Sequence, residues 1–291
     1  MSRIVVTNLD PRFQVFRLGR LVDAFAIFTE RFTVFVDTMD SPEAVSEMWT
    51  LIQEFRSDLA RPLVINTHSD WDHAWGNGFF DGPNAHVSAP IIGRSGNEAD
   101  SQARLNDKRA EEPAVYESVE IRAPMLIPDG DLTIRGGDLT LEIFPTPGHT
   151  PDHVSVWVPE AAVLLTGDAA ESPLPYVGER SSIPQFRQSL KKLRSVGART
   201  VLYSHGHGLT TPDVLQRNID YFDQAEARCR EWVVSRGTEN QPSPELLNWR
   251  LEDVVPAGLT LETDDWAFYE EAHARAISAM TRYLALPGVV R

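Results

Sequence analysis

The stretch Thr67-His68-Ser69-Asp70-Trp71-Asp72-His73 decides how this 291-residue chain is interpreted. It places two imidazoles and two carboxylates within six residues, directly after the apolar run Leu63-Val64-Ile65. Side chains this close do not all point the same way on one regular strand, whereas a loop at a strand end can turn them toward one point. Neutral histidine nitrogens and aspartate oxygens both suit a divalent cation. The alternative is an ordinary polar surface loop, and the rest of the chain decides between the two.

The composition is that of an acidic globular protein. Hydrophobic residues make up 42% of the chain, which is enough for a sizeable core. The formal net charge of -15 and the pI near 4.9 argue against a nucleic-acid partner or an anionic membrane surface, because both require clustered Lys and Arg. No apolar run is long enough to cross a bilayer. The N-terminus also lacks the apolar stretch and cleavage site of a signal peptide, so we expect a cytoplasmic protein.

Several single residues are expected to be structural. Cys229 is the only cysteine, which excludes an intrachain disulfide and a cysteine-rich zinc site. It lies on the apolar side of a helical pattern and is expected to be a buried thiol rather than a nucleophile. His273 lies on the apolar face of the last helical pattern and is expected in the core. His86 is expected to be structural or exposed.

Hydrophobic periodicity predicts alternating strands and helices along the chain. Turn residues at Asp129-Gly130 and Gly136-Gly137 predict hairpins within 124–145. No repeat or flexible linker is visible, so we expect one domain over residues 1–236 and a C-terminal helical extension, 237–291, packed on it. The predicted strands are 13–18, 24–28, 32–36, 63–65, 87–89, 139–143, 153–158, 162–165 and 201–203, and the predicted helices are 41–55, 93–112, 183–196, 211–236 and 266–284.

A His or Asp follows the end of four of these apolar runs, usually beside a glycine. Ligands grouped at one end of a buried sheet are how α/β enzymes build their sites. Seven potential ligands are too many for one tetrahedral zinc ion and suit two metal ions that share a bridging ligand. These residues are His68, Asp70, Asp72 and His73 after the first run, then His149, Asp168 and His207.

With these motifs the sequence resembles the metallo-β-lactamase superfamily, which includes glyoxalase II, lactonases and the flavodiiron proteins. The family signature is His-x-His-x-Asp-His, a Gly-His, an Asp at a strand end and a last His. This chain has the matching motifs in that order over roughly residues 13–210. The resemblance implies an α/β (α+β) fold, an αββα sandwich of two mixed β-sheets flanked by helices.

The resemblance also implies the metal ligands. The first ion would be held by His68, Asp70 and His149, the second by Asp72, His73 and His207, and Asp168 would bridge them. His205 is an alternative to His207. Asp70 replaces the usual histidine, whereas flavodiiron proteins have glutamate there. The added carboxylate makes the site more anionic, which favours iron or manganese over zinc, although zinc remains an alternative.

The expected activity is that of a dinuclear metal-dependent hydrolase. A metal-bridging hydroxide would attack a small ester, thioester, lactone or amide. Asp72 or Asp168 would orient the nucleophile or relay its proton. The residues expected to contact the small-molecule substrate are Trp71, His153, Tyr176 and Arg180.

Two other functions fit the same residues. One is a di-iron oxidoreductase with flavodiiron-like site chemistry, acting on O₂, NO or an oxidisable substrate and needing a separate electron donor. The other is a metal-stabilised binding protein without catalysis. The C-terminal extension would cover the pocket or form a homodimer contact.

Overall fold

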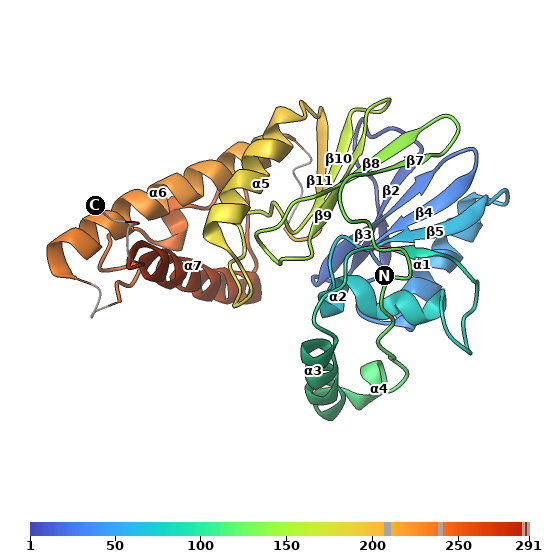
Figure 1. Cartoon of the computed structure of the whole chain (residues 1–291), viewed down its shortest axis with the longest axis horizontal. Helices are drawn as coiled ribbons and strands as arrows, with labels where there is room; N and C mark the ends of the chain where they lie inside the picture. The colour runs from blue at the N-terminus through green and yellow to red at the C-terminus, as the bar shows by residue number, and fades with distance from the viewer. Residues whose placement is uncertain (207–210, 238–240, 287–288, 290–291) are drawn as a thin grey trace. The chain divides into compact units, whose positions relative to one another are not determined.

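The computed structural model describes residues 1–206, 211–237, 241–286 and 289. They form two compact units. Unit 1 comprises Met1–Pro145, Asp152–Gly167 and Arg199–His205, and unit 2 comprises Thr146–Pro151, Asp168–Ala198 and the described part of 206–291. All strands of the described residues belong to unit 1, and the helices 183–195, 213–236 and 263–284 belong to unit 2 (Figure 1).

Unit 1 contains two mixed β-sheets. The six-stranded sheet has the order β1-β2-β3-β4-β5-β6, antiparallel from β1 to β4 and parallel from β4 to β6. The five-stranded sheet has the order β11-β10-β9-β8-β7, in which only the β10–β11 pair is parallel. The strands are β1 Ser2–Ile4, β2 Phe13–Leu18, β3 Val22–Phe28, β4 Phe32–Val36, β5 Arg61–Ile65, β6 Ile91–Ile92, β7 Leu132–Arg135, β8 Thr140–Pro145, β9 Val154–Val158, β10 Val163–Gly167 and β11 Thr200–Tyr203.

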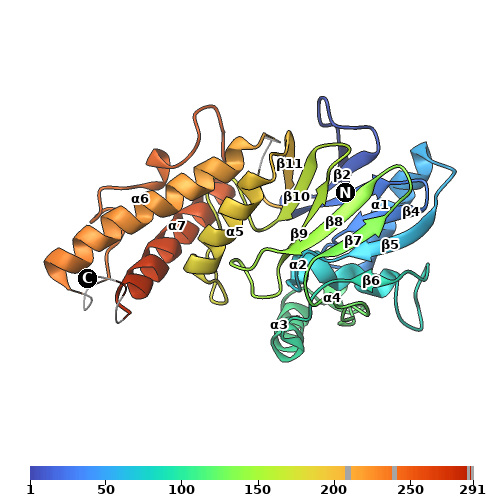
Figure 2. The same cartoon turned by 45° about the horizontal axis from the view of Figure 1, so that its top comes forward.

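The two sheets are seen in Figure 2. The main core consists of alternate residues from strands of both sheets. Ile27 and Ile65 from the first sheet and Val156 and Leu165 from the second are all fully buried there. Burying such a side chain contributes about 1.5–3 kcal/mol relative to leaving it in water. The other face of the first sheet is also covered, so β3 is buried along its whole length.

Helices of unit 1 cover the first sheet and carry the first motif. Helix α1 Pro42–Phe55 begins at Ser41, whose hydroxyl accepts a hydrogen bond from Ala44 N, and its apolar face packs on the sheet. The remaining helices of this unit are α2 Trp71–Ala74, η1 Trp75–Phe79, α3 Glu98–Glu111 and α4 Pro113–Tyr116.

Unit 2 is helical. Its helices are α5 Ile183–Ser195, α6 Asp213–Arg236, η2 Leu251–Asp253 and α7 Thr263–Leu284, and α6 and α7 lie side by side (Figure 1). His273 of α7 is fully buried, with Nδ1 2.9 Å from the hydroxyl of Tyr221 and Nε2 2.9 Å from the carbonyl of Trp249. Cys229 of α6 is buried against α7, and its thiol lies 3.7 Å from the carbonyl of Ile277. The expected core positions of both residues are confirmed.

The predicted fold class, two mixed sheets with flanking helices, is confirmed. The strand predicted at 87–89 is wrong: the pairing residues are Ile91 and Ile92, which follow Pro90 and are buried against β5. Within 124–145 only one hairpin forms, β7 to β8, with its turn at Gly136-Gly137. The division at residue 236 stays a prediction. Among the described residues no helix has the length and apolar character needed to cross a membrane.

Candidate metal centre

The predicted motif covers the end of the loop that follows β5 and the first three residues of α2. The apolar strand ends at Ile65, and His68 follows in the loop with its side chain fully buried. Asp70 is the residue before α2, and its carbonyl accepts the backbone N–H of His73 at 3.0 Å. A helix of four residues therefore presents Asp72 and His73, and both are buried.

Three potential ligands of unit 1 converge at the end of this short helix. Asp72, His73 and His205 each offer one ligand atom, and these atoms all lie within 4.8 Å of one another. The two Nε2 atoms of His73 and His205 are 3.2 Å apart, and His205 Nε2 is 3.4 Å from Asp72 Oδ2. Two imidazoles and a carboxylate at this separation match the donor set of a borderline divalent cation.

A carboxylate that was not predicted orients His73. Asp37 follows β4, is 1% exposed and has a left-handed backbone with φ of 67°, which aspartate tolerates better than most residues. It accepts hydrogen bonds from Thr67 N at 2.7 Å and from the Thr67 hydroxyl at 2.8 Å. His73 Nδ1 lies 2.8 Å from Asp37 Oδ2, so Nδ1 carries the proton and Nε2 presents its lone pair.

The same carboxylate also determines the tautomer of His68. The Thr67 hydroxyl has one proton, which it donates to Asp37. The contact of 3.0 Å between Thr67 Oγ1 and His68 Nδ1 must therefore be donated by His68. Both histidines of the motif then present Nε2 as an acceptor, which is the form that binds a metal ion.

Backbone contacts fix the position of His73. Its carbonyl accepts hydrogen bonds from Thr38 N at 2.8 Å, the Thr38 hydroxyl at 3.1 Å and Asn66 Nδ2 at 3.3 Å. The side-chain oxygen of Asn77 accepts a hydrogen bond from Asn66 Nδ2 at 3.1 Å and shares the Thr38 hydroxyl proton with the His73 carbonyl. Gly76 makes this packing possible, because a Cβ there would lie 1.9 Å from Thr38 O.

Unit 2 contributes a second pair of predicted ligands. His149 Nε2 lies 3.6 Å from Asp168 Oδ2, and both residues are buried. His149 Nδ1 is 3.3 Å from the carbonyl oxygen of Tyr176. Because a carbonyl only accepts, His149 also has its proton on Nδ1 and its lone pair on Nε2. The hydroxyl of Ser181 donates to His149 O at 2.8 Å and fixes the backbone.

Comparison with known proteins identifies the family. A family model for the metallo-beta-lactamase superfamily matches residues 18–205, well over half of the chain. The chain belongs to the metallo-beta-lactamase superfamily.

Relatives and solved structures within this superfamily differ in the share of the chain that they match. A hydroxyacylglutathione hydrolase from Rhodospirillum rubrum is 29% identical over 186 residues, 63% of each chain. An N-acyl homoserine lactonase from Bacillus sp. is 30% identical over 146 residues, 46% of this chain and 50% of that protein. The chain thus spans less than two thirds of the length of these relatives. A beta-lactamase domain protein from Burkholderia ambifaria has the same fold, with a TM-score of 0.65 at 19% identity over 97% of this chain and 88% of that one.

The remaining predicted residues lie in different surroundings. Asp70 Oδ2 is 3.7 Å from His68 Nε2, which places this unusual carboxylate beside a predicted ligand atom. His205, the alternative to His207, belongs to the unit 1 donor group. His207 lies outside the described residues.

The four residues predicted to contact substrate have different neighbours. His153 is fully buried, with its ring stacked on that of His68 at 5.0 Å, which favours support of the ligand over contact with substrate. Trp71 packs edge-on against Tyr116 and lies under the ammonium group of Lys108, 4.6 Å from its ring centre. Tyr176 and Arg180 share the loop that contacts His149.

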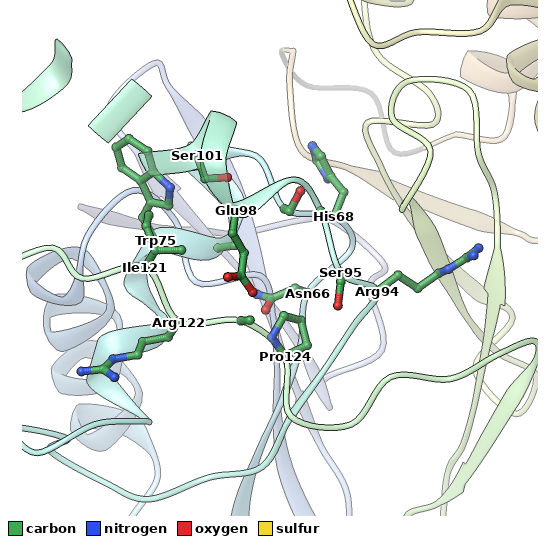
Figure 3. A pocket seen from close by; sticks show the side chains of 14 residues that line it. Asn66, His68, Trp75, Arg94, Ser95, Glu98, Ser101, Ile121, Arg122 and Pro124 are labelled. Atoms are coloured by element: carbon green, nitrogen blue, oxygen red, sulfur yellow. The ribbon is translucent and has the colours of Figure 1, made fainter. Parts of the chain in front are cut away.

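A small pocket of about 30 Å³ lies beside His68 in unit 1. Asn66 and Glu98 both line it, while the side chains of Arg94 and Arg122 extend in opposite directions (Figure 3). This volume suits about one or two water molecules, whereas small-molecule sites usually measure about 300–1,000 Å³. The pocket is therefore a niche behind the ligand loop rather than a substrate site.

Proposed function

We propose that this protein is a dinuclear metal-dependent hydrolase that acts on a small ester, thioester, lactone or amide. The observation that carries the proposal is the set of histidines whose Nδ1 protons are engaged by Asp37, Thr67 and the Tyr176 carbonyl, so that every Nε2 presents a lone pair. Hydrogen bonding of this kind is the usual support of metal-binding histidines. The names of the relatives, a hydrolase and a lactonase, agree with this class of reaction.

The proposed ligands are those of the family motif with one change. Asp72, His73 and His205 would hold one ion, because their ligand atoms lie together in unit 1. His68, Asp70 and His149 would hold the other, and Asp168 would bridge. When bound, two divalent ions would polarise the scissile carbonyl and lower the pKa of attacking water. Zinc, iron and manganese are all compatible with this donor set.

The chain's own carboxylates have separate proposed tasks. Asp37 is buried and accepts three hydrogen bonds, through which it would orient the imidazoles rather than contact the substrate. Asp72 Oδ2 lies 3.4 Å from His205 Nε2 and Oδ1 lies 3.9 Å from His73 Nε2, so this carboxylate sits within the donor group, where it would accept a proton from attacking water. Asp168 is the second carboxylate that would orient the attacking water.

The test of this proposal compares metal-depleted and reloaded protein. We expect chelation to abolish hydrolysis in a screen of p-nitrophenyl esters, thioesters and lactones, and stoichiometric metal to restore it. An Asp72→Asn variant should lose at least a hundredfold in kcat while its unfolding transition stays cooperative. Full turnover by metal-free protein would contradict the proposal.

A di-iron oxidoreductase is a second candidate, favoured by one observation. Asp70 adds a hard oxygen donor 3.7 Å from His68 Nε2, where most hydrolases of the family would have a nitrogen. Protein loaded with iron under nitrogen and then exposed to O₂ would show a visible absorption change if this alternative holds. A colourless protein that contains only zinc as purified and hydrolyses esters would exclude it.

A further inference from the structure

Phe268 is an exposed aromatic side chain that is held in a fixed orientation. It lies on α7, with 51% of its surface exposed, and its ring stacks on that of Tyr176 with centroids 5.8 Å apart and planes 5° from parallel. Offset parallel stacking of this kind is favourable by itself, yet it leaves the rest of the Phe268 ring in water. The stacked pair therefore offers an ordered aromatic surface of which the Phe268 ring is half exposed.

Hydrogen bonds keep the stacked pair in place. Arg275 donates to the Tyr176 hydroxyl, and its guanidinium lies 5.4 Å from the centre of the Tyr176 ring. Arg275 in turn pairs with Glu271, one turn earlier on α7. Arg275 and Glu271 carry opposite charges, whereas Asp264 and Asp265, four and three residues before Phe268, add negative charge to this part of α7. Because the rings are already ordered, a ligand that covers them loses little additional conformational entropy.

The stacked pair is continuous with a predicted metal ligand of the same unit. The Tyr176 carbonyl accepts the Nδ1 proton of His149, and the two rings lie 6.0 Å apart. One residue therefore orients the ligand and also carries the aromatic surface. The Tyr176 ring thus lies close to both the His149 ring and the Phe268 ring.

We propose that Tyr176 and Phe268 bind the apolar part of the substrate, a long acyl chain or an aryl group attached to the scissile carbonyl. This inference rests on the proposed hydrolase function and specifies its substrate class: hydrophobic esters, thioesters or lactones rather than short or highly charged ones. Each methylene that is removed from water on this surface should raise kcat/KM about threefold to fourfold until the surface is covered.

The test is a chain-length series of p-nitrophenyl esters from acetate to decanoate. For the unaltered protein we expect kcat/KM to rise with chain length. In Phe268→Ala the ratio of kcat/KM for the octanoate ester to kcat/KM for the acetate ester should fall about tenfold. Leu246→Ala is the matched control, because Leu246 is also an exposed apolar residue of unit 2, 61% exposed, and its ratio should not change. An unchanged ratio in Phe268→Ala would overturn the inference.

A binding measurement separates this inference from the proposed function. Sodium octanoate, the product of the longer ester, should bind the protein as purified, and calorimetry should show affinity about fivefold to tenfold weaker for Phe268→Ala. This result would support the surface even if no ester were hydrolysed, in which case only the proposed reaction fails. Equal octanoate affinity in both proteins, or a Phe268→Ala effect confined to oligomeric state in light scattering, would contradict the inference.

Discussion

Asp37 accepts three hydrogen bonds, and through them one carboxylate determines the tautomers of both His68 and His73. In the Asp37→Asn variant the amide nitrogen cannot accept a proton donor, so one of these contacts is lost or the ring of His73 reverses its tautomer. We expect metal affinity to fall about 10- to 100-fold. The measurement is competition with a chromophoric chelator.

The control for this variant is Asp138→Asn. Asp138 pairs with Arg12 through a bond of 2.9 Å in the same unit and touches none of the predicted ligands, so its removal should leave the chelator competition unchanged. Equal metal affinity for Asp37→Asn and the unaltered protein would show that Asp37 does not orient the ligands.

Variants of His205 and His207 decide which of these two histidines is the metal ligand. His205 Nε2 lies 3.4 Å from Asp72 and 3.2 Å from His73, whereas His207 has only the family motif in its favour. We expect His205→Gln to retain about one ion per chain after gel filtration and His207→Gln to retain two. The reverse pattern, measured by elemental mass spectrometry, would restore His207 as the ligand.

At the scale of elements, the packing of α2 and η1 against the end of β4 depends on Gly76. A Cβ at this position would lie 1.9 Å from Thr38 O and 2.5 Å from Val45 Cγ2. Both neighbours are held by the surrounding structure, so Gly76→Ala should lower the free energy of unfolding by about 3 kcal/mol or more. Urea unfolding measures this loss.

Gly130→Ala is the matched control for Gly76→Ala. Nothing lies within 4 Å of a Cβ at Gly130. The added methyl group restricts only the unfolded chain there, so stability should stay constant or rise by up to about 1 kcal/mol. Two variants of equal stability would refute the close contact at Gly76.

The contact of α6 with α7 should depend on pH. Burial lowers the pKa of His273, although the Trp249 carbonyl and the charges of Asp253 and Glu245 partly oppose this. The unfolded chain then binds a proton more readily than the folded one, so the stability from this group is complete above about pH 6.5 and is lost as the pH falls below that value. Unfolding free energies measured from pH 8 to 5 should decline less in His273→Gln, and parallel curves would contradict this account.

The parts predicted from sequence are those that local pattern determines. Apolar runs followed by His or Asp located the ligand loop after β5 and the strands β8, β10 and β11. The same rule fits Asp37, which follows the predicted strand 32–36. Its role depends on contacts with Thr67, which is distant in sequence, and a local pattern does not predict such a contact. Phe268 could not be assigned either, since its stacking on Tyr176 is a contact between distant segments.

For the whole molecule, the acidic composition and the groups of potential metal ligands both favour bound cations. A net charge of -15 at neutral pH includes buried carboxylates at the predicted centre, whose mutual repulsion bound cations would relieve. An ion that binds only the folded state stabilises it in proportion to the logarithm of its concentration over Kd. Chelation should therefore lower the melting temperature as well as the activity.

The central claim is that this chain holds two divalent ions. The most direct test is elemental mass spectrometry on protein purified without added metal, with protein concentration from amino-acid analysis. We expect two ions of zinc, iron or manganese per chain, and their loss on dialysis against chelator. A content well below one ion per chain that does not rise on incubation with any of the three metals would contradict it.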